Sequence, residues 1–571
     1  MTRVSQHFPT DTAGLPESHP PEVLEPGDGG QIELRIAPVA KPISGATVRM
    51  LAYNGSIPGP TLRVRQGSRL AVNLINEGDL ETTVHWHGLR VENRYDGTPE
   101  TQRPVAVGES LTSHLQFPDP GIYWYHPHIR EDYTQEMGLY GAIVVVPGET
   151  DYWPPVNREL VLILDDFLLE DGKAAPFSRT VTTYTAMGRY GNVFLVNGEP
   201  CPTLDVKLGE VVRFYLVNTA NTRVFHVALH GARLKRVGGD SGRYEREELI
   251  DSLLISPSER IVVDARFENP GPVTLVHRTP RQAYLLAVIM VGEEPANPSL
   301  AGPFEQLRTN ADLAAERDRL GPYLAAEPDR TLALVAEMNL EEPELPSDRL
   351  VYTCPMHPAV SRDQPGRCPE CGMKLMAAAA ATEYVCPMHP EIRSSQADRC
   401  SLCGMKLLPA RLVEGATGES HHHHPTEHHG PSAAPASPDA TGFPGGIEWE
   451  DDMVEVNRGT TPANMRWKLI DRATGAEGAA IDWRFRVGDR VKIRLVNEMD
   501  SDHPMQHPFH IHGAGRFLIL SRDGAVEPNL VWKDTVLIPT GQTVDILLEV
   551  SNPGRWMAHC HIAEHHESGM M

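Results

Sequence analysis

Short runs of hydrophobic residues, bounded by turns rich in Gly and Pro, make up most of the first part of this chain. Residues 61–65, 70–76 and 142–146 are typical runs, and residues 53–60 form a loop by their Gly and Pro content. Runs of this length and spacing, without a helical period, are typical of strands in a β-sandwich. The pattern therefore predicts a Greek-key β-sandwich over residues 31–150.

The same pattern returns twice further along the chain. A Gly turn followed by a hydrophobic strand that ends in Asn occurs near residues 64, 206 and 487. Internal repetition of this kind indicates several copies of one structural unit. We predict an all-β chain with three Greek-key sandwich domains, at residues 31–150, 151–295 and 447–571.

The remaining ranges differ in composition. Residues 1–30 are polar and Pro-rich and are expected to be flexible, whereas residues 296–349 are expected to form a linker with a helix near 311–320. Residues 411–446 are rich in Gly, Ser, Pro and His, which predicts a disordered linker. A small Cys/His-rich insertion, residues 350–410, is therefore expected between the second and third sandwich domains.

The insertion consists of two tandem units, because each Cys and His of the first recurs 32 residues later. Three Cys and one His form a tetrahedral zinc set, while Cys together with Met is soft enough to select Cu(I). Each unit is predicted to bind Zn²⁺ or Cu(I), and two disulfide-bonded knuckles are the alternative. The predicted ligands are Cys354, His357, Cys368 and Cys371 in the first unit and Cys386, His389, Cys400 and Cys403 in the second. The His-rich composition of residues 421–429 also predicts metal binding.

Composition and charge narrow the class of protein. The chain has 571 residues, and its 48 Gly and 49 Pro favour a turn-rich β protein. Its net charge of −24 argues against nucleic acid as a partner, because phosphate binding needs a basic surface. No apolar run is long enough to span a membrane, and no leader peptide is recognisable. The protein is expected to be periplasmic or extracellular if a leader was removed, and cytoplasmic otherwise; its oligomeric state stays open.

Four His-x-His elements carry the candidate chemistry. On a strand, residues i and i+2 share one face, so each element presents two imidazoles side by side. In the last element Cys560 faces away from His559 and His561, so one short strand can serve two metal centres. His507 and His565 remain to join Cys560, and a His₂Cys set with a weak Met is the ligand set of a blue-copper site. The four elements are His85/His87, His126/His128, His510/His512 and His559/His561.

These motifs resemble those of the multicopper oxidases, and the closing His-Cys-His-x-x-x-His-x-x-x-x-Met-Met resembles the bacterial cuproxidase/laccase branch. The resemblance covers the three sandwich domains and implies a cupredoxin-like fold with four copper ions. It implies a type 1 copper held by His507, Cys560, His565 and Met570, and a type 2 copper held by His85 and His510. The type 3 pair would take His87, His126, His128, His512, His559 and His561.

The resemblance also implies a reaction. A reducing substrate would give four single electrons at the type 1 copper, and O2 would be reduced to water at the other three. Asp96, in an Asp-Gly pair after the first motif, matches the family's proton-supplying acid. A second acid of the bacterial enzymes is replaced here by His566, whose imidazole can also relay protons.

The tandem units resemble the small heavy-metal-binding domain of copper and silver efflux proteins, with its Cys-Pro-Met-His-Pro signature. They lie where the bacterial cuproxidases carry a Met-rich insertion. Tethered binding units raise the local concentration of their ligand, so Cu(I) is the expected reductant. Two alternatives stay open: a laccase that oxidises phenols, and a protein that mainly stores copper.

Overall fold

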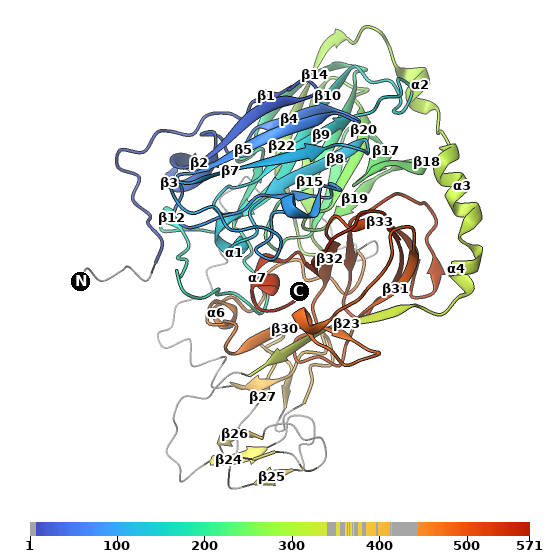
Figure 1. The fold of residues 1–571 in the computed structure, drawn as a ribbon. Coiled ribbons are helices and arrows are strands. Elements are labelled where there is room, and N and C mark those ends of the chain that lie inside the picture. The colour runs from blue at the N-terminus through green and yellow to red at the C-terminus, as the bar shows by residue number, and fades with distance from the viewer. Residues whose placement is uncertain are drawn as a thin grey trace.

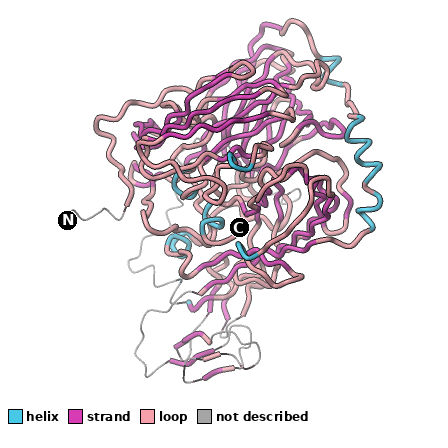
Figure 2. The backbone as a smooth tube through the Cα atoms, in the orientation of Figure 1, coloured by secondary structure: helices cyan, strands magenta, loops and turns pink. Residues whose placement is uncertain are grey.

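The computed structural model describes residues 7–339, 384–394, 398–410, 413 and 443–571, with short pieces between 350 and 379. Strands dominate the described residues, and the few helices lie along one side and around the C-terminus (Figures 1 and 2). None of the described helices is long and apolar enough to cross a membrane.

The first domain is a sandwich of two sheets. One sheet has the order β1-β4-β9-β8-β6 and the other the order β3-β2-β5-β7. The first comprises β1 (Val23–Leu24), β4 (Thr61–Arg65), β9 (Gly141–Val146), β8 (Gly121–His126) and β6 (His85–His87). The second comprises β3 (Ala46–Tyr53), β2 (Gly30–Ile43), β5 (Arg69–Asn76) and β7 (Ser110–Gln116). Two short helices follow β6 and β8: η1 (Asn93–Tyr95) and α1 (Glu131–Thr134).

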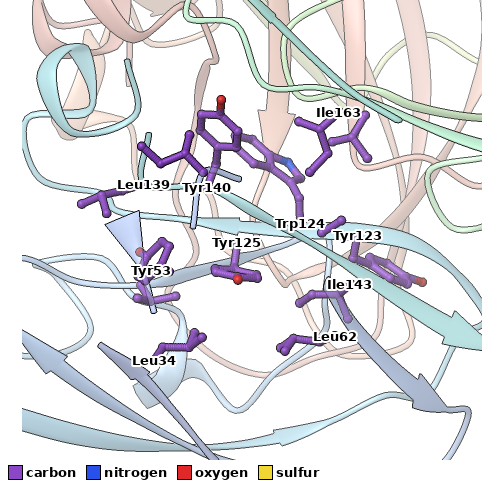
Figure 3. Packing of buried hydrophobic residues seen from close by; sticks show 14 of the residues in the cluster. Leu34, Tyr53, Leu62, Tyr123, Trp124, Tyr125, Leu139, Tyr140, Ile143 and Ile163 are labelled. Atoms are coloured by element: carbon purple, nitrogen blue, oxygen red, sulfur yellow. The ribbon is translucent and has the colours of Figure 1, made fainter. Parts of the chain in front are cut away.

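The space between these sheets is filled by aliphatic and aromatic side chains. Leu34, Leu62 and Ile143 face the rings of Tyr53 and Tyr125 there (Figure 3). All five are at most 1% exposed, and full burial of such a side chain contributes roughly 1.5–3 kcal/mol. This core fixes β6 and β8, whose ends carry the histidines of the first two motifs.

The second domain is also a sandwich, with sheets β13-β10-β15-β20-β17-β18 and β14-β22-β21-β16-β19. The first sheet comprises β13 (Val193–Val196), β10 (Arg158–Phe167), β15 (Val211–Asn218), β20 (Arg260–Arg266), β17 (Arg233–Gly239) and β18 (Gly242–Ile250). The second comprises β14 (Thr203–Leu208), β22 (Ala283–Pro295), β21 (Gly271–Arg278), β16 (Phe225–His230) and β19 (Ser252–Ile255). A small ribbon joins β11 (Leu169–Glu170) to β12 (Lys173–Ala174).

The third domain has a six-stranded sheet, β30-β23-β31-β36-β33-β34, and a three-stranded sheet, β35-β32-β37. The larger comprises β30 (Met465–Asp471), β23 (Arg330–Met338), β31 (Arg490–Asn497), β36 (Thr543–Val550), β33 (Gly515–Arg522) and β34 (Ala525–Val526). The smaller comprises β35 (Thr535–Ile538), β32 (His507–Ile511) and β37 (Ala558–Cys560). Helices α6 (Val454–Arg458), η3 (Gly478–Ala480) and α7 (Ala563–Glu567) complete it. The three β-sandwiches confirm the predicted fold class.

The expected linker at 296–349 holds more structure than the sequence indicated. It contains α2 (Ala301–Glu305), α3 (Ala311–Arg319) and α4 (Gly321–Ala325), and α3 lies where a helix was predicted. It also contains β23, which pairs with β30 and β31 and so belongs to the third sandwich. The Cys/His insertion therefore leaves the chain between two neighbouring strands of the third domain.

Two further ranges were expected to lack structure. Residues 7–30 are packed against the first domain instead: β1 pairs with β4, and the ring of Phe8 stacks on Tyr133 at 3.6 Å between centroids. Of the range 411–446, only residues 413 and 443–446 lie in the described part, so the His-rich tract falls outside it.

Each unit of the insertion has a small sheet of its own. The first unit contains β24 (Leu350–Thr353), β25 (Ser361–Arg362) and β26 (Met376–Ala379). The second contains β27 (Tyr384–Val385), β28 (Arg393–Ser394) and β29 (Leu408–Pro409). In Figure 1 the sheet of the first unit projects from the molecule, and β27 lies nearer to β23 and β30.

Candidate metal centres

Two strand pairs bring the four His-x-His elements together. In the first domain β6 pairs with β8, which sets His85 opposite His126. In the third domain β32 pairs with β37, which sets His510 opposite His559. The two pairs face each other across the domain interface, because the ring centroids of His87 and His510 lie 3.8 Å apart. Eight imidazoles thus form one cluster between the first and third domains.

Within this cluster several groups of three rings have ligand atoms within 4.8 Å of one another. One group contains His85, His87 and His510; a second contains His87, His126 and His561; a third contains His128, His512 and His559. All eight side chains are at most 3% exposed. The first group contains both histidines that the resemblance gives to a type 2 copper, and the other two groups contain only histidines that it gives to the type 3 pair.

The chemistry of these imidazoles suits metal ions. Burial, and then the neighbouring imidazoles, lower the pKa values of His87, His126, His512, His559 and His561 well below the usual range. The rings are therefore neutral, which is the form that binds metals. Several buried ring nitrogens of the cluster have no hydrogen-bond partner: Nε2 of His85, His126, His128, His510 and His561, and Nδ1 of His87 and His561. Buried polar atoms rarely stay unsatisfied, so these nitrogens fit the copper ions that the motifs predict.

Asp96, the predicted acid, lies beside this cluster. Its carboxylate accepts a hydrogen bond from His512 Nδ1 at 2.9 Å, and its backbone oxygen accepts one from His85 Nδ1 at 2.6 Å. Both rings are thereby oriented with Nε2 toward the cluster. The next residue must be glycine, because Gly97 has φ +87° and a Cβ there would lie 2.0 Å from the Val84 oxygen.

A buried ion pair that the sequence analysis missed supports the other side of the cluster. Asp534 accepts a hydrogen bond from His87 Nε2 at 3.1 Å, and its backbone oxygen accepts one from His510 Nδ1 at 2.9 Å. Arg260, from β20 of the second domain, donates to both carboxylate oxygens at 2.6 and 2.5 Å. Arg260 and other groups outweigh burial and lower the pKa of Asp534 well below its usual range. Nothing in the local sequence marks this pair, since its members lie 274 residues apart.

His566, the second predicted relay, lies against a buried carboxylate that the sequence analysis also missed. Glu131, in α1, is fully buried; its Oε1 lies 2.8 Å from His128 Nδ1 and its Oε2 lies 3.5 Å from His566 Nδ1. Burial alone would lower the pKa of His566, but Glu131 raises it to about 9. Burial would raise the pKa of Glu131, but His128 and His566 hold it well below the usual range. The fold thus places a buried carboxylate from α1 between His128 and His566.

The expected blue-copper ligands form a second, separate cluster. Cys560 Sγ lies 3.5 Å from His507 Nδ1 and 3.8 Å from His565 Nδ1, and the two ring nitrogens are 3.3 Å apart. All three side chains are at most 1% exposed. Burial raises the pKa of the Cys560 thiol, and a bound metal ion would remove that proton. Met570 is fully buried and tied to this cluster, because its backbone oxygen accepts from the Cys560 amide at 3.0 Å.

Trp467, on β30, covers this second cluster and was not singled out from the sequence. Its ring stacks on His565 at 3.9 Å between centroids and meets His507 at 4.8 Å. The indole Nε1 donates to the Thr185 oxygen at 2.6 Å, so the ring is fixed. A single Trp in a strand carries no signal of this role.

The second Cys/His unit forms a third cluster. Cys386, His389, Cys400 and Cys403 place their ligand atoms within 4.8 Å of one another, and Cys386 and Cys400 are buried. The thiol of Cys403 is the main cause that lowers the pKa of Cys386 to about 5. Cys386, Cys400 and Cys403 are free thiols, so no disulfide joins them. The predicted ligands of the first unit, Cys354, His357, Cys368 and Cys371, lie outside the described residues.

Comparisons with known proteins agree with this geometry. The sequence profiles described as multicopper oxidase match residues 37–150 and 452–571, and that described as heavy metal binding domain matches residues 351–378 and 383–410. A multicopper oxidase of Staphylococcus epidermidis is 22% identical over 531 residues, covering 91% of this chain and 82% of that protein.

Solved structures show the same fold. A multicopper oxidase of Campylobacter jejuni, described as a metallo-oxidase, matches with a TM-score of 0.61 at 19% identity and covers 99% of this chain and 98% of its own. A laccase-like multicopper oxidase of Ochrobactrum, with activity toward lignin model compounds, also has a TM-score of 0.61, at 20% identity and with 97% and 98% coverage.

Proposed function

This chain is a multicopper oxidase, and on that premise we propose that Cu(I) is the substrate it oxidises while it reduces O2 to water. The proposal assigns the type 1 copper to His507, Cys560, His565 and Met570. It assigns the type 2 copper to His85 and His510. The type 3 pair is assigned to His87, His126, His128, His512, His559 and His561.

When bound, the copper ions supply one-electron acceptance at the type 1 site and four-electron reduction of O2 at the other three. The chain supplies the connection between them. Cys560 is covalently joined to His559 and His561, and β37 holds this segment against β32 through the pairing of Cys560 with Phe509. One strand thus links the two clusters without a gap.

Protons must reach the site of oxygen reduction, and three buried groups are placed to hold them. Asp96 touches the His512 side of the histidine cluster, and Glu131 touches the His128 side. His566 lies next to Glu131. We assign Asp96 to proton supply on one side of the cluster, and the Glu131–His566 pair to proton supply on the other.

The location of the second Cys/His unit is the main support for Cu(I) as the substrate. Its buried Cys386 and Cys400 belong to the same hydrophobic cluster as Cys560 and Met570. That cluster also contains the buried thioethers of Met187, Met338, Met388, Met405, Met453, Met465 and Met505. Thiolate and thioether ligands select Cu(I), so the neighbourhood of the type 1 site favours this ion over a phenol.

Oxygen uptake with Cu(I), Fe(II) and a phenol, measured side by side on the copper-loaded protein, tests the proposal. We expect the highest kcat/KM with Cu(I), with uptake abolished by a Cu(I) chelator. A higher kcat/KM for the phenol would favour a laccase instead. That alternative has support from the similarity to a rice protein named putative laccase-17, 24% identical over 90% of this chain.

A further inference from the structure

The two Cys/His units repeat the same ligands, but their described core residues pack in different hydrophobic clusters. In the first unit the described core residues Leu375, Tyr352 and Val360 form a small cluster of their own. In the second unit Cys386 and Cys400 lie inside the main core cluster of the third domain. The second unit therefore packs into the hydrophobic core of the third domain, which also contains Cys560 and Met570.

The second unit contacts one loop in particular, residues 498–506, which ends directly before the type 1 ligand His507. Arg399 donates to the backbone oxygen of Ser501, and its other guanidinium nitrogen lies 3.3 Å from Asp500. Lys406 Nζ lies 3.8 Å from Asp502. Gly404, which lies between Arg399 and Lys406 in the sequence, faces the side chain of Met499.

The residues that make these contacts also carry half of the metal site. Residues 399–406 contain both Cys400 and Cys403, and a tight turn joins them: the Cys400 amide donates to the Met405 oxygen at 2.7 Å, and the Gly404 amide to the Cys400 oxygen at 2.8 Å. A metal ion bound by both thiolates would fix this turn, and with it Arg399 and Lys406. A d10 ion such as Zn²⁺ or Cu(I) accepts this ligand set.

The end of this loop is also held next to the type 1 ligand itself. The backbone of Glu448 is joined to the Gln506 side chain by two hydrogen bonds, at 2.8 and 3.2 Å. Gln506 is fully buried and is the neighbour of His507. A shift of residues 498–506 would therefore reach the type 1 histidine through a buried, hydrogen-bonded neighbour.

We infer that a Zn²⁺ or Cu(I) ion bound by Cys386, His389, Cys400 and Cys403 fixes residues 498–506 in place through the contacts of the second unit. This metal-dependent contact, called the clasp below, makes the geometry of the type 1 site depend on whether the second unit holds its metal ion. The inference rests on the proposed assignment of His507 to the type 1 copper, and it holds whether or not Cu(I) is the substrate. The first unit has no such role, since its described core residues cluster apart from the third domain.

Two matched double variants of the full-length protein test the clasp. C400S/C403S removes two ligands of the second unit, and C368S/C371S makes the same change 32 residues earlier in the first. Elemental analysis should show that each loses bound zinc or copper relative to the parent. Only C400S/C403S should shift the visible absorption and the reduction potential of the type 1 copper. It should also slow anaerobic reduction of that copper by a phenol by about twofold to tenfold, a range typical of a broken contact network.

A third variant separates the clasp from simple misfolding of the unit. R399A/K406A keeps all four ligands and removes the contacts to residues 498–506. It should retain the metal of the second unit and still shift the type 1 absorption and potential in the same direction as C400S/C403S. The inference is overturned if C400S/C403S loses its metal but keeps the parent spectrum and potential, if it loses no metal at all, or if R399A/K406A matches the parent. Because the reductant here is a phenol, these outcomes are independent of the rate with Cu(I).

Discussion

At the scale of single residues, buried charged side chains contact the clustered histidines from several sides. His and Cys at alternate positions on a strand are a local pattern, so His85, His510 and Cys560 could be found from spacing alone. Glu131 lies three residues after His128, which it contacts, and Asp534 contacts His87 and His510, but no sequence motif marks these carboxylates or Arg260. A charged residue is normally solvent-exposed, and only the fold shows that these three are buried.

Met570 offers a test of the type 1 assignment. A thioether is a weak axial ligand that stabilises the oxidised copper, and leucine cannot bind. We expect M570L to raise the reduction potential by an amount on the order of 59 mV, which is a tenfold change in a one-electron equilibrium. Redox titration of the visible band measures it, and an unchanged or lower potential would show that Met570 is not the axial ligand.

Glu131 offers a test of the assigned proton path. E131Q keeps the shape of the side chain and removes the carboxylate that lies between His128 and His566. Loss of a positioned acid or base costs about 10²- to 10⁴-fold, so we expect reoxidation by O2 to slow by about a hundredfold while reduction of the type 1 copper stays normal.

Stopped-flow absorbance separates these two half-reactions. E564Q is the matched control, since Glu564 is equally buried but lies near Asn221 and Thr222 of the second domain. Equal reoxidation rates in E131Q and E564Q would rule out a specific role for Glu131.

At the scale of elements, strand runs and turn residues were enough to predict three sandwiches, and the helix near 311–320 was found by its composition. β23 was missed for a physical reason. It is separated from its partner β30 by more than a hundred residues of insertion and linker, and its neighbours in the sequence are helices and a loop. Its pairing with β30 and β31 is long-range, and such pairing depends on the whole domain rather than on local sequence.

The position of the insertion next to β23 and β30 makes its removal informative. Deletion of residues 345–410 removes both Cys/His units. We expect Cu(I) oxidation to fall about tenfold more than phenol oxidation, because the tethered source of Cu(I) is lost, whereas loss of the contacts to residues 498–506 slows both substrates. Parallel oxygen-electrode assays with both substrates measure the change, and a protein whose Cu(I) rate is unaffected would refute the role of the insertion.

At the scale of the whole molecule, the domains are joined by buried charges as well as by the histidine cluster. Arg260 of the second domain reaches Asp534 of the third, and Asp534 in turn holds His87 of the first. The histidine cluster itself takes four imidazoles from the first domain and four from the third. Copper bound there would tie two domains together, so metal content and stability are linked.

Removal of copper should therefore destabilise the whole chain. A ligand at about a thousand times its Kd adds about 4.1 kcal/mol, and each kcal/mol moves the Tm of a domain of this size by about 2–4 °C. We expect the Tm of the metal-free protein to lie on the order of 10 °C lower in differential scanning calorimetry. Reconstitution with copper should restore it; an identical Tm with and without copper would mean that the metal does not bridge the domains.

In the proposed reaction, electrons taken up next to Cys560 reduce O2 at the histidine cluster. The most direct measurement is the ratio of Cu(I) oxidised to O2 consumed, together with hydrogen peroxide, in the parent and in C560S. We predict four Cu(I) per O2 without peroxide in the parent, and neither blue absorption nor catalysed uptake in C560S. A ratio of two with peroxide formed, or a C560S protein that stays blue and active, would contradict the proposed reaction.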